Sequence, residues 1–317
     1  MSLGSVIDGS RLFWQVERCS VYLERIALIA GGTAERERRD YGRSLPSMSE
    51  ERSAHPPTAP QMEIPGSKRS DGEASVDFTI AEEVCIAAEA SALTIATVPI
   101  YNVNNPDFIL YRECFPWLLD SRGEPLPPET FMPSLERTGM VRWFDRYIVR
   151  RVIRALRDQP DLILGVNISA LSAVADALWA STLIDLQQLP DIAQRLVLEI
   201  SENAPLILSR ARRFGNMLRQ LGCAIAIDDF GAAYGVETNI AIDRPDIIKI
   251  DALFRSGIST DINVRSRLAG MIRIASDISP KVIVKGVEHE ADIEHIRDAG
   301  ALWAQGRCFE RQYPCFV

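Results

Sequence analysis

The stretch Leu221–Asp251, LGCAIAIDDFGAAYGVETNIAIDRPDIIKID, decides the predicted fold. Ala224–Ile227 is a short apolar run that ends in two adjacent carboxylates, Asp228 and Asp229. Such a run is typical of a strand buried on both faces. A second run of this kind, Ile247–Ile250, carries Lys249 near its end. Acids at the tip of one strand and a lysine at the tip of the next indicate a β/α-barrel site. The alternative is that the two aspartates only cap a helix or form a turn.

The rest of the sequence from about residue 76 alternates apolar strands with helical stretches. The expected strands are Leu93–Asn102, Phe108–Cys114, Ile163–Ile168, Leu196–Ile200, Ala224–Ile227, Ile247–Ile250, Val282–Val284 and Trp303–Cys308. One long helix is expected at Pro133–Gln159. Eight strands over about 240 residues predict a closed, mainly parallel (β/α)8 barrel of the TIM type. An open doubly wound sheet is the alternative, but the first strand–helix turn lacks a glycine-rich phosphate fingerprint.

The composition excludes several classes of function. The net charge of −8 and pI of about 5.1 argue against a general binder of nucleic-acid polymers or membrane surfaces. Six single cysteines show no metal-ligand spacing and indicate reduced thiols. The sequence has no apolar run long enough to span a membrane, so we expect a cytoplasmic protein.

The predicted domain organisation has three parts. Residues 1–43 are expected to be an N-terminal helical segment, in which the apolar face of Leu12–Ala30 fits either self-association into a homodimer or packing back onto the main domain. Residues 44–75 contain five prolines and few aliphatic side chains, which predicts a disordered linker. Residues 76–317 form the barrel domain.

Polar side chains follow the tips of six successive predicted strands. They are Asn167, Glu199 with Glu202, Asp228 with Asp229, Lys249, Lys285 with Glu288, and Gln305. Unpartnered buried carboxylates are costly, so we expect these groups to converge on one rim. Carboxylate and amide oxygens suit Mg²⁺, Mn²⁺ or Ca²⁺, and a pair of such ions would polarise a phosphodiester.

These motifs, in this order, resemble the EAL-domain family, whose active members are β/α-barrel phosphodiesterases of the bacterial second messenger cyclic di-GMP. The resemblance rests on PETFMPSLERTGMV (Pro128–Val141), VNIS (Val166–Ser169), LEISE (Leu198–Glu202), DDFGAAYG (Asp228–Gly235), PDIIKID (Pro245–Asp251), KGVE (Lys285–Glu288) and QG (Gln305–Gly306). It implies metal ligation by Asn167, Glu199, Asp228 and Asp229, with support from Lys249, Glu202 and Gln305. It also implies that Arg112 contacts a phosphate of the dinucleotide.

The departures from the family pattern predict a degenerate site. The Glu-Ala-Leu-x-Arg motif is laid on Phe108–Arg112, FILYR, so Phe108 replaces the metal-binding glutamate. Lys285 replaces the first acid of Glu-Gly-Val-Glu, and Val98 replaces the glutamine of Gln-Pro-Ile. The hypothesis is that Lys285 pairs with Asp228, Asp229 or Glu199 and takes over the electrostatic role of a missing metal. The metal site would then be vestigial and empty.

Three functions compete on this interpretation. The first is a signal-transduction receptor that binds cyclic di-GMP without hydrolysis and without a cofactor, through Arg112, Asp229, Lys249, Glu288, Gln305 and the Pro133–Glu136 region. The second is a protein–protein interaction module that has lost the nucleotide. The third is a weak residual phosphodiesterase, which alone would need Mg²⁺ or Mn²⁺.

Overall fold

The structure is a computed structural model, and it describes residues 71–90, 92–119, 125–201, 207–232, 242–255, 257–309 and 315–316. The predicted helix at Leu12–Ala30 and almost all of the predicted linker lie outside the described residues. The chain divides into two units, one ending at Glu89 and one beginning at Ala90. The first described element, helix α2 (Asp71–Glu89), crosses the domain boundary that the sequence placed near residue 75.

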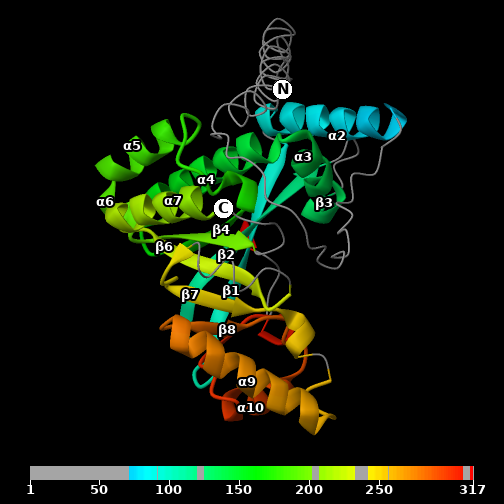
Figure 1. Ribbon diagram of the computed structural model, residues 1–317, viewed down its shortest axis with the longest axis vertical. Helices are drawn as coiled ribbons and strands as arrows, with labels where there is room; N and C mark the ends of the chain where they lie inside the picture. The colour runs from blue at the N-terminus through cyan, green and yellow to red at the C-terminus, as the bar shows by residue number, and fades with distance from the viewer. Residues whose placement is uncertain are drawn as a thin grey trace, which may run out of the picture. The chain divides into compact units, whose positions relative to one another are not determined.

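Eight strands close into a barrel in the second unit (Figure 1). They are β1 (Leu93–Asn102), β2 (Ile109–Leu119), β4 (Leu164–Ile168), β5 (Leu196–Ser201), β6 (Ala224–Phe230), β7 (Ile247–Ile250), β8 (Val282–Val284) and β9 (Trp303–Ala304). The hydrogen-bonded order runs β1-β9-β8-β7-β6-β5-β4-β2, and β1 pairs with β2 to close the ring. β1 is antiparallel to both of its barrel neighbours, whereas the other strands are parallel. Two short strands, β3 (Pro125–Leu126) and β10 (Cys315–Phe316), extend the sheet by pairing with β2 and β1.

Helices cover the outside of the barrel. They are α3 (Met132–Thr138), α4 (Val141–Asp158), α5 (Ala180–Gln188), α6 (Pro190–Ala193), α7 (Leu208–Leu221), α9 (Ile262–Ile278) and α10 (Glu290–Asp298). Short 3₁₀ turns are η1 (Pro128–Thr130), η2 (Ala170–Ser172), η3 (Ala252–Phe254) and η4 (Arg307–Phe309). In Figure 1, α4 to α7 gather along one side of the strands, and α9 and α10 lie together at another.

The single helix predicted at Pro133–Gln159 is two helices. α3 ends at Gly139, which adopts a left-handed φ of +74° that a non-glycine residue reaches at a cost. α4 then starts afresh and packs Phe144, Ile148 and Val152 inward at helical spacing. Because α4 begins as a separate helix, its first turns bring Phe144 and Asp145 to the ends of the strands.

The barrel interior is filled by side chains from six strands: Ile100, Tyr111, Val197, Ala226, Ile247 and Ile283. It is therefore a packed core and not a channel. The carboxyl ends of β2 and of β4 to β9 meet at one rim, because these strands run parallel. The polar residues at those ends are thereby brought together.

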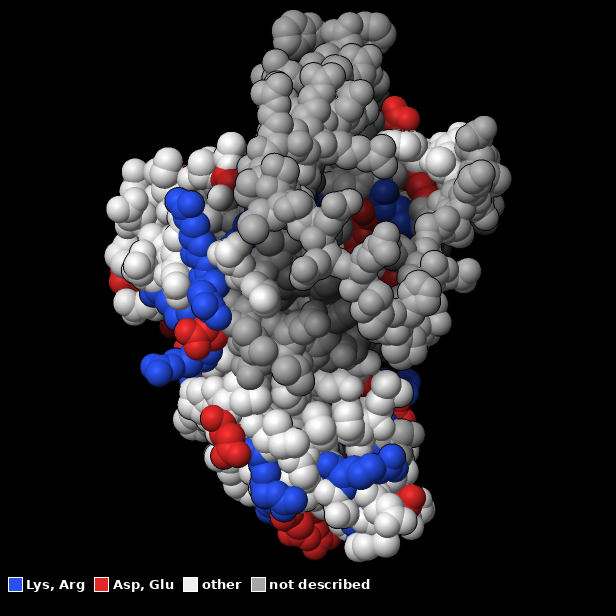
Figure 2. All heavy atoms as spheres, viewed as in Figure 1, with Lys and Arg blue, Asp and Glu red and all other residues white. Residues whose placement is uncertain are grey.

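Acidic and basic side chains are interspersed over the end of the barrel that α9 and α10 cover (Figure 2). Such a mixed surface does not form the single-sign field that attracts a polyanion. Among the helices that the structure describes, none combines the length and the hydropathy needed to cross a bilayer.

Candidate functional site

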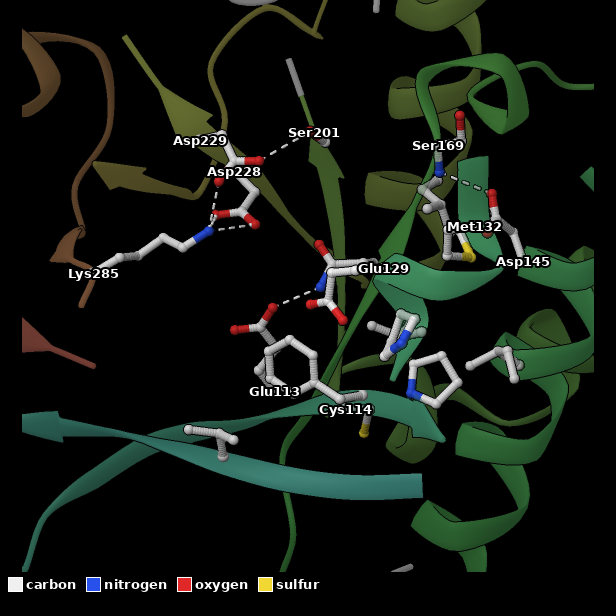
Figure 3. Close-up of a pocket in the computed structure, with 18 of the residues that line it drawn as sticks. Glu113, Cys114, Glu129, Met132, Asp145, Ser169, Ser201, Asp228, Asp229 and Lys285 are labelled. Atoms are coloured by element: carbon white, nitrogen blue, oxygen red, sulfur yellow. Dashed lines mark hydrogen bonds and ion pairs between the residues drawn. The ribbon is translucent and has the colours of Figure 1, made fainter. Parts of the chain in front are cut away.

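The tip of β6 presents two consecutive carboxylates to one lysine. The pairing of β6 with β7 shifts register between Ile227 and Phe230, and Asp229 has a left-handed φ of +57°. In a regular strand, neighbouring side chains point to opposite faces, so this irregularity lets Asp228 and Asp229 face the same way. Lys285 Nζ donates to Asp228 Oδ1 at 2.8 Å, to Asp228 Oδ2 at 2.9 Å and to Asp229 Oδ1 at 2.7 Å (Figure 3). The predicted pairing of Lys285 with these aspartates is confirmed.

A second lysine lies buried in the barrel interior beside these acids. Lys249, on β7, is fully buried and binds the carboxylates of Glu113 on β2 and Glu199 on β5. Its Nζ lies 2.6 Å from Glu113 Oε2, hydrogen-bonds Glu199 Oε2, and lies 3.6 Å from Asp228 Oδ1. Four carboxylates therefore share two ammonium groups at the rim.

Two side-chain amides donate hydrogen bonds to Glu113. Asn167 Nδ2 donates to Glu113 Oε1 at 2.6 Å, and Gln305 Nε2 donates to Glu113 Oε2 at 2.6 Å. Each of β2, β4, β5, β6 and β7 contributes one or two groups to the cluster, and residues just after β8 and β9 contribute Lys285 and Gln305. The convergence predicted for the strand tips is thus present with Glu113 added, except that Glu288 lies outside the cluster and Glu202 is not among the described residues.

Gly165 leaves room for the buried acids. A Cβ at this position would come within 2.3 Å of Glu199 Oε1 and 2.4 Å of the Tyr111 ring. Glu199 Oε1 and the Tyr111 hydroxyl are both buried and have no hydrogen-bond partner among the described residues. An orphaned buried carboxylate oxygen is costly, which indicates that this site has capacity for one more donor or a cation.

The electrostatics of the cluster differ from acid to acid. Burial, with the nearby charge of Glu113, raises the pKa of Glu199 to about 8. Burial would also raise the pKa of Asp228, but the ammonium groups of Lys249 and Lys285 outweigh burial and hold it below its usual value. Burial lowers and the surrounding carboxylates raise the pKa values of Lys249 and Lys285, and the carboxylates prevail. Both lysines therefore stay charged, as partnered buried amines do.

The donor set has the oxygen chemistry of one divalent-cation site, although the Lys249 ammonium contacts all three acids that would form it. One oxygen from each of Glu113, Glu199 and Asp228 lies within 4.8 Å of the other two, and hard oxygen ligands of this kind suit Mg²⁺ or Mn²⁺. Asn167 stands beside them. Beside Asp229 the fit fails, because the Lys285 ammonium lies against both aspartates, where a second cation would have to bind.

A cavity of about 490 Å³ opens from this cluster toward η1, α3 and α4. Its wall includes Glu129, Met132, Glu136 and Phe144 on that side, and Asp228, Asp229, Lys285 and Gln305 on the barrel side. Asp145 also lines the cavity and accepts a hydrogen bond from the Ser169 backbone N–H at 2.8 Å. Burial raises the pKa of Asp145 to about 7.

The motif register proposed from the sequence at Phe108–Arg112 is wrong. Phe108 is 65% exposed in the connection between β1 and β2, at the amino end of the barrel. Arg112 adjoins Glu113 on β2, so it points to the opposite face of the strand, and it does not line the cavity. The glutamate of the pattern is Glu113, five residues further on, and the arginine position then falls on Trp117. The acid is kept and the arginine is lost, which is the reverse of what Phe108–Arg112 implied.

The other predicted site residues divide into three groups. Glu136, Asn167, Asp229 and Gln305 line the cavity, as does Val98. Pro133 does not line it, and Glu288 is exposed and bound to Arg307 at 2.8 Å. Glu202 lies outside the described residues.

The comparisons with known proteins agree with this geometry. The sequence model of the EAL domain matches residues 82–312. An uncharacterized protein of Mycobacterium tuberculosis is 28% identical over 71% of this chain, and the cyclic di-GMP phosphodiesterase PdeL of Escherichia coli is 25% identical over 60% of it. The matches cover 37% and 54% of those two proteins, so the chain spans only part of their length.

Solved structures show the same fold. The EAL domain of Pseudomonas aeruginosa FimX, bound to cyclic di-GMP, superposes with a TM-score of 0.62 at 24% identity and covers 75% of this chain and 96% of its own. The Xanthomonas citri FimX EAL domain, also bound to cyclic di-GMP, gives a TM-score of 0.64 at 20% identity over 75% of this chain and 94% of its own. With the family match extending over most of the chain, the protein belongs to the EAL domain family.

Proposed function

We propose that this protein is a cyclic di-GMP receptor that does not hydrolyse its ligand. The observation that carries the proposal is the set of three hydrogen bonds from Lys285 Nζ to Asp228 and Asp229. An ammonium at hydrogen-bond distance from both carboxylates repels a dication that approaches the same oxygens. Without a second cation, the site cannot clamp both the attacking and the leaving oxygen of a phosphodiester.

The cavity supports ligand binding even where hydrolysis fails. Its volume of about 490 Å³ lies within the range of about 300–1,000 Å³ that small-molecule pockets occupy. Lys285 lines it, so a phosphate in the cavity would approach a cation and not bare carboxylates. The ligand is named from relatives: PdeL is a cyclic di-GMP phosphodiesterase, and the FimX structures contain that dinucleotide.

Calorimetric titration with cyclic di-GMP, in EDTA and then in Mg²⁺ or Mn²⁺, tests binding. Chromatography of the same mixtures tests hydrolysis to the linear dinucleotide. The informative variant is Lys285→Glu, and the matched control is Lys281→Glu, which makes the same charge change just before the amino end of β8. Phe108 needs no replacement, because Glu113 already supplies the acid.

The proposal predicts saturable binding in EDTA with no turnover for the wild-type protein and for Lys281→Glu. Lys285→Glu should lose EDTA-resistant binding by about tenfold or more, because the cavity then presents only acids to the phosphates. It should also gain affinity for Mn²⁺, measured without nucleotide. Wild-type turnover comparable to that of an active family member would refute the proposal.

An interaction module that has lost the nucleotide is the second candidate, and one observation favours it. Among the described residues that line the cavity, Lys285 is the sole lysine or arginine, and two carboxylates already hold it. A phosphate would therefore have to compete for that ammonium. No heat from cyclic di-GMP at about millimolar concentration, with the protein folded, would select this candidate.

A weak residual phosphodiesterase is the third candidate. The corrected motif register favours it. With Glu113 in place of Phe108 as the glutamate of the motif, Glu113, Glu199 and Asp228 together offer a cation site. Slow turnover that requires Mg²⁺ or Mn²⁺ and disappears in EDTA would select it. A homodimer, a protein partner and a cytoplasmic location remain predictions from the sequence.

A further inference from the structure

The connection between β1 and β2 exposes a large aromatic side chain at the end of the barrel opposite the cavity. Asn102, at the end of β1, pairs with Trp303 at the start of β9, so the connection lies at the amino end of the parallel strands. Phe108 is 65% exposed there. Burying a phenylalanine side chain is favourable by about 1.5–3 kcal/mol, so a partner that covers Phe108 would gain free energy from that contact.

The connection is held in one shape by its own hydrogen bonds. The Asn102 side-chain oxygen accepts from the N–H groups of Asn104 at 2.9 Å and Asn105 at 3.1 Å. The backbone closes with Asn102 N–H to Phe108 O at 2.9 Å and Phe108 N–H to Asn105 O at 2.9 Å. Because the turn is already ordered, a partner that covers Phe108 loses little conformational entropy on this side.

A second cavity, of about 600 Å³, lies beside this turn. It is lined by the turn and its flanks, by one side of α10, and by η4. Tyr101 and Phe309 stack in its wall, with ring centroids 5.0 Å apart. Ile109 and Ile293 add aliphatic surface, so much of the wall is apolar.

The charged side chains of this cavity are mainly acidic. Asp107, Glu290 and Glu294 line it, with Arg297 as the one cation among the described lining residues. Arg297 Nη2 donates to Val103 O at 2.8 Å, which anchors the turn to α10. Three carboxylates against one guanidinium give the described lining a net negative charge, which complements a basic side chain.

We propose that this surface, Phe108 with the cavity lined by Asp107, Glu290 and Glu294, docks an extended segment of a partner protein. The segment places a lysine or arginine in the acidic cavity and an adjacent apolar side chain against Phe108. The aliphatic stem of the basic residue packs on the Tyr101–Phe309 stack, as long cationic side chains do on apolar surfaces. None of the described residues that line this cavity lines the cavity beside Lys285, so this docking does not depend on the proposed nucleotide binding.

The test uses the full chain and two fluorescent synthetic peptides, one alternating arginine with leucine and one alternating glutamate with leucine. Fluorescence anisotropy measures their affinities at low and high salt. Glu294→Lys removes the charge complementarity and Phe108→Ser removes the apolar contact. The matched controls are Asp158→Lys, at the exposed end of α4, and Leu253→Ser, which removes another highly exposed apolar side chain.

The arginine peptide should bind saturably, and salt should weaken it, because exposed charges are screened. Glu294→Lys should weaken binding about tenfold and Phe108→Ser about fivefold, with both controls within about twofold of the wild type. Circular dichroism checks that each variant is folded.

Three results would overturn the proposal. The first is no saturable binding of the arginine peptide at about 1 mM, and the second is equal binding of the glutamate peptide. The third is a concentration-dependent dimer, seen by light scattering, that Phe108→Ser abolishes. This last result would assign the surface to a second copy of the chain.

Discussion

Asp145 is a buried carboxyl group whose pKa differs between the folded and the unfolded chain. It is almost fully buried at the cavity wall, where burial raises its pKa from an ordinary 3.8 to about 7, with a smaller contribution from the facing Glu136. The hydrogen bond that Asp145 accepts from the Ser169 N–H favours the charged form but does not offset burial. Between these two pKa values, the unfolded chain has released this proton and the folded chain still holds it.

Folding stability should therefore fall as pH rises through that window, because there the native state binds more protons than the unfolded state. Relative to Asp145→Asn, the wild-type protein should lose about 2–3 kcal/mol of unfolding free energy between about pH 5 and about pH 8. Urea unfolding at both pH values measures this difference. Asp158→Asn, on the exposed end of the same helix, is the control and should track the wild type. A wild-type protein that gains stability over Asp145→Asn toward alkaline pH would contradict the prediction.

Of the charged residues in the cluster, Lys285 was predictable from the sequence and Glu113 was not. Lys285 beside two aspartates was predictable, because strand tips of a parallel barrel share one rim. Glu113 was missed because the motif was anchored on an arginine five residues too early. A signal was present: Tyr111 and Glu113 alternate along one strand and face inward together, so a glutamate there requires partners in the core. Those partners, Lys249, Asn167 and Gln305, are visible only once the barrel is closed.

At the scale of elements, the end of β6 combines a register shift with a left-handed residue. Asp229, at φ +57°, is a residue type that tolerates this conformation, whereas β-branched residues do not. Asp229→Asn and Asp229→Val both remove the charge facing Lys285, so their difference combines the backbone cost of valine with the hydrogen bonds that asparagine can keep to Lys285 and Ser201. We expect the valine variant to be less stable by about 1–3 kcal/mol in urea unfolding. Equal stability of the two variants would mean that the turn does not require this conformation.

Strand positions were largely predictable, but their directions were less so. Leu93–Asn102 and Val282–Val284 match β1 and β8 residue for residue. The antiparallel course of β1 was not predicted, although residues 103–108 are too few for the crossover that two parallel strands need. The break between α3 and α4 was missed in the same way, because a helical apolar pattern continues across Gly139 and only its φ angle ends the first helix.

For the whole molecule, the ion cluster ties the barrel together across its interior. Lys249 on β7 contacts Glu113 on β2, Glu199 on β5 and Asp228 on β6, strands far apart in the sequence. The low exposure of these four groups leaves little water to replace a lost partner. Removing one member of a buried ion network therefore costs more than the network contributes, because it leaves uncompensated charge.

Lys249→Met should accordingly lower the unfolding free energy by about 3–5 kcal/mol, as measured by urea denaturation. Glu199→Gln placed in the same chain should recover part of that loss, because it removes one of the stranded carboxylates. We expect a coupling free energy of at least about 1 kcal/mol in the double-mutant cycle. Lys281→Met, just before β8 on the outside of the cluster, is the matched control and should change stability by no more than about 0.5 kcal/mol. If Lys249→Met were as stable as the wild type, the three acids would not depend on that ammonium, and the cluster would have to be stabilised by another group.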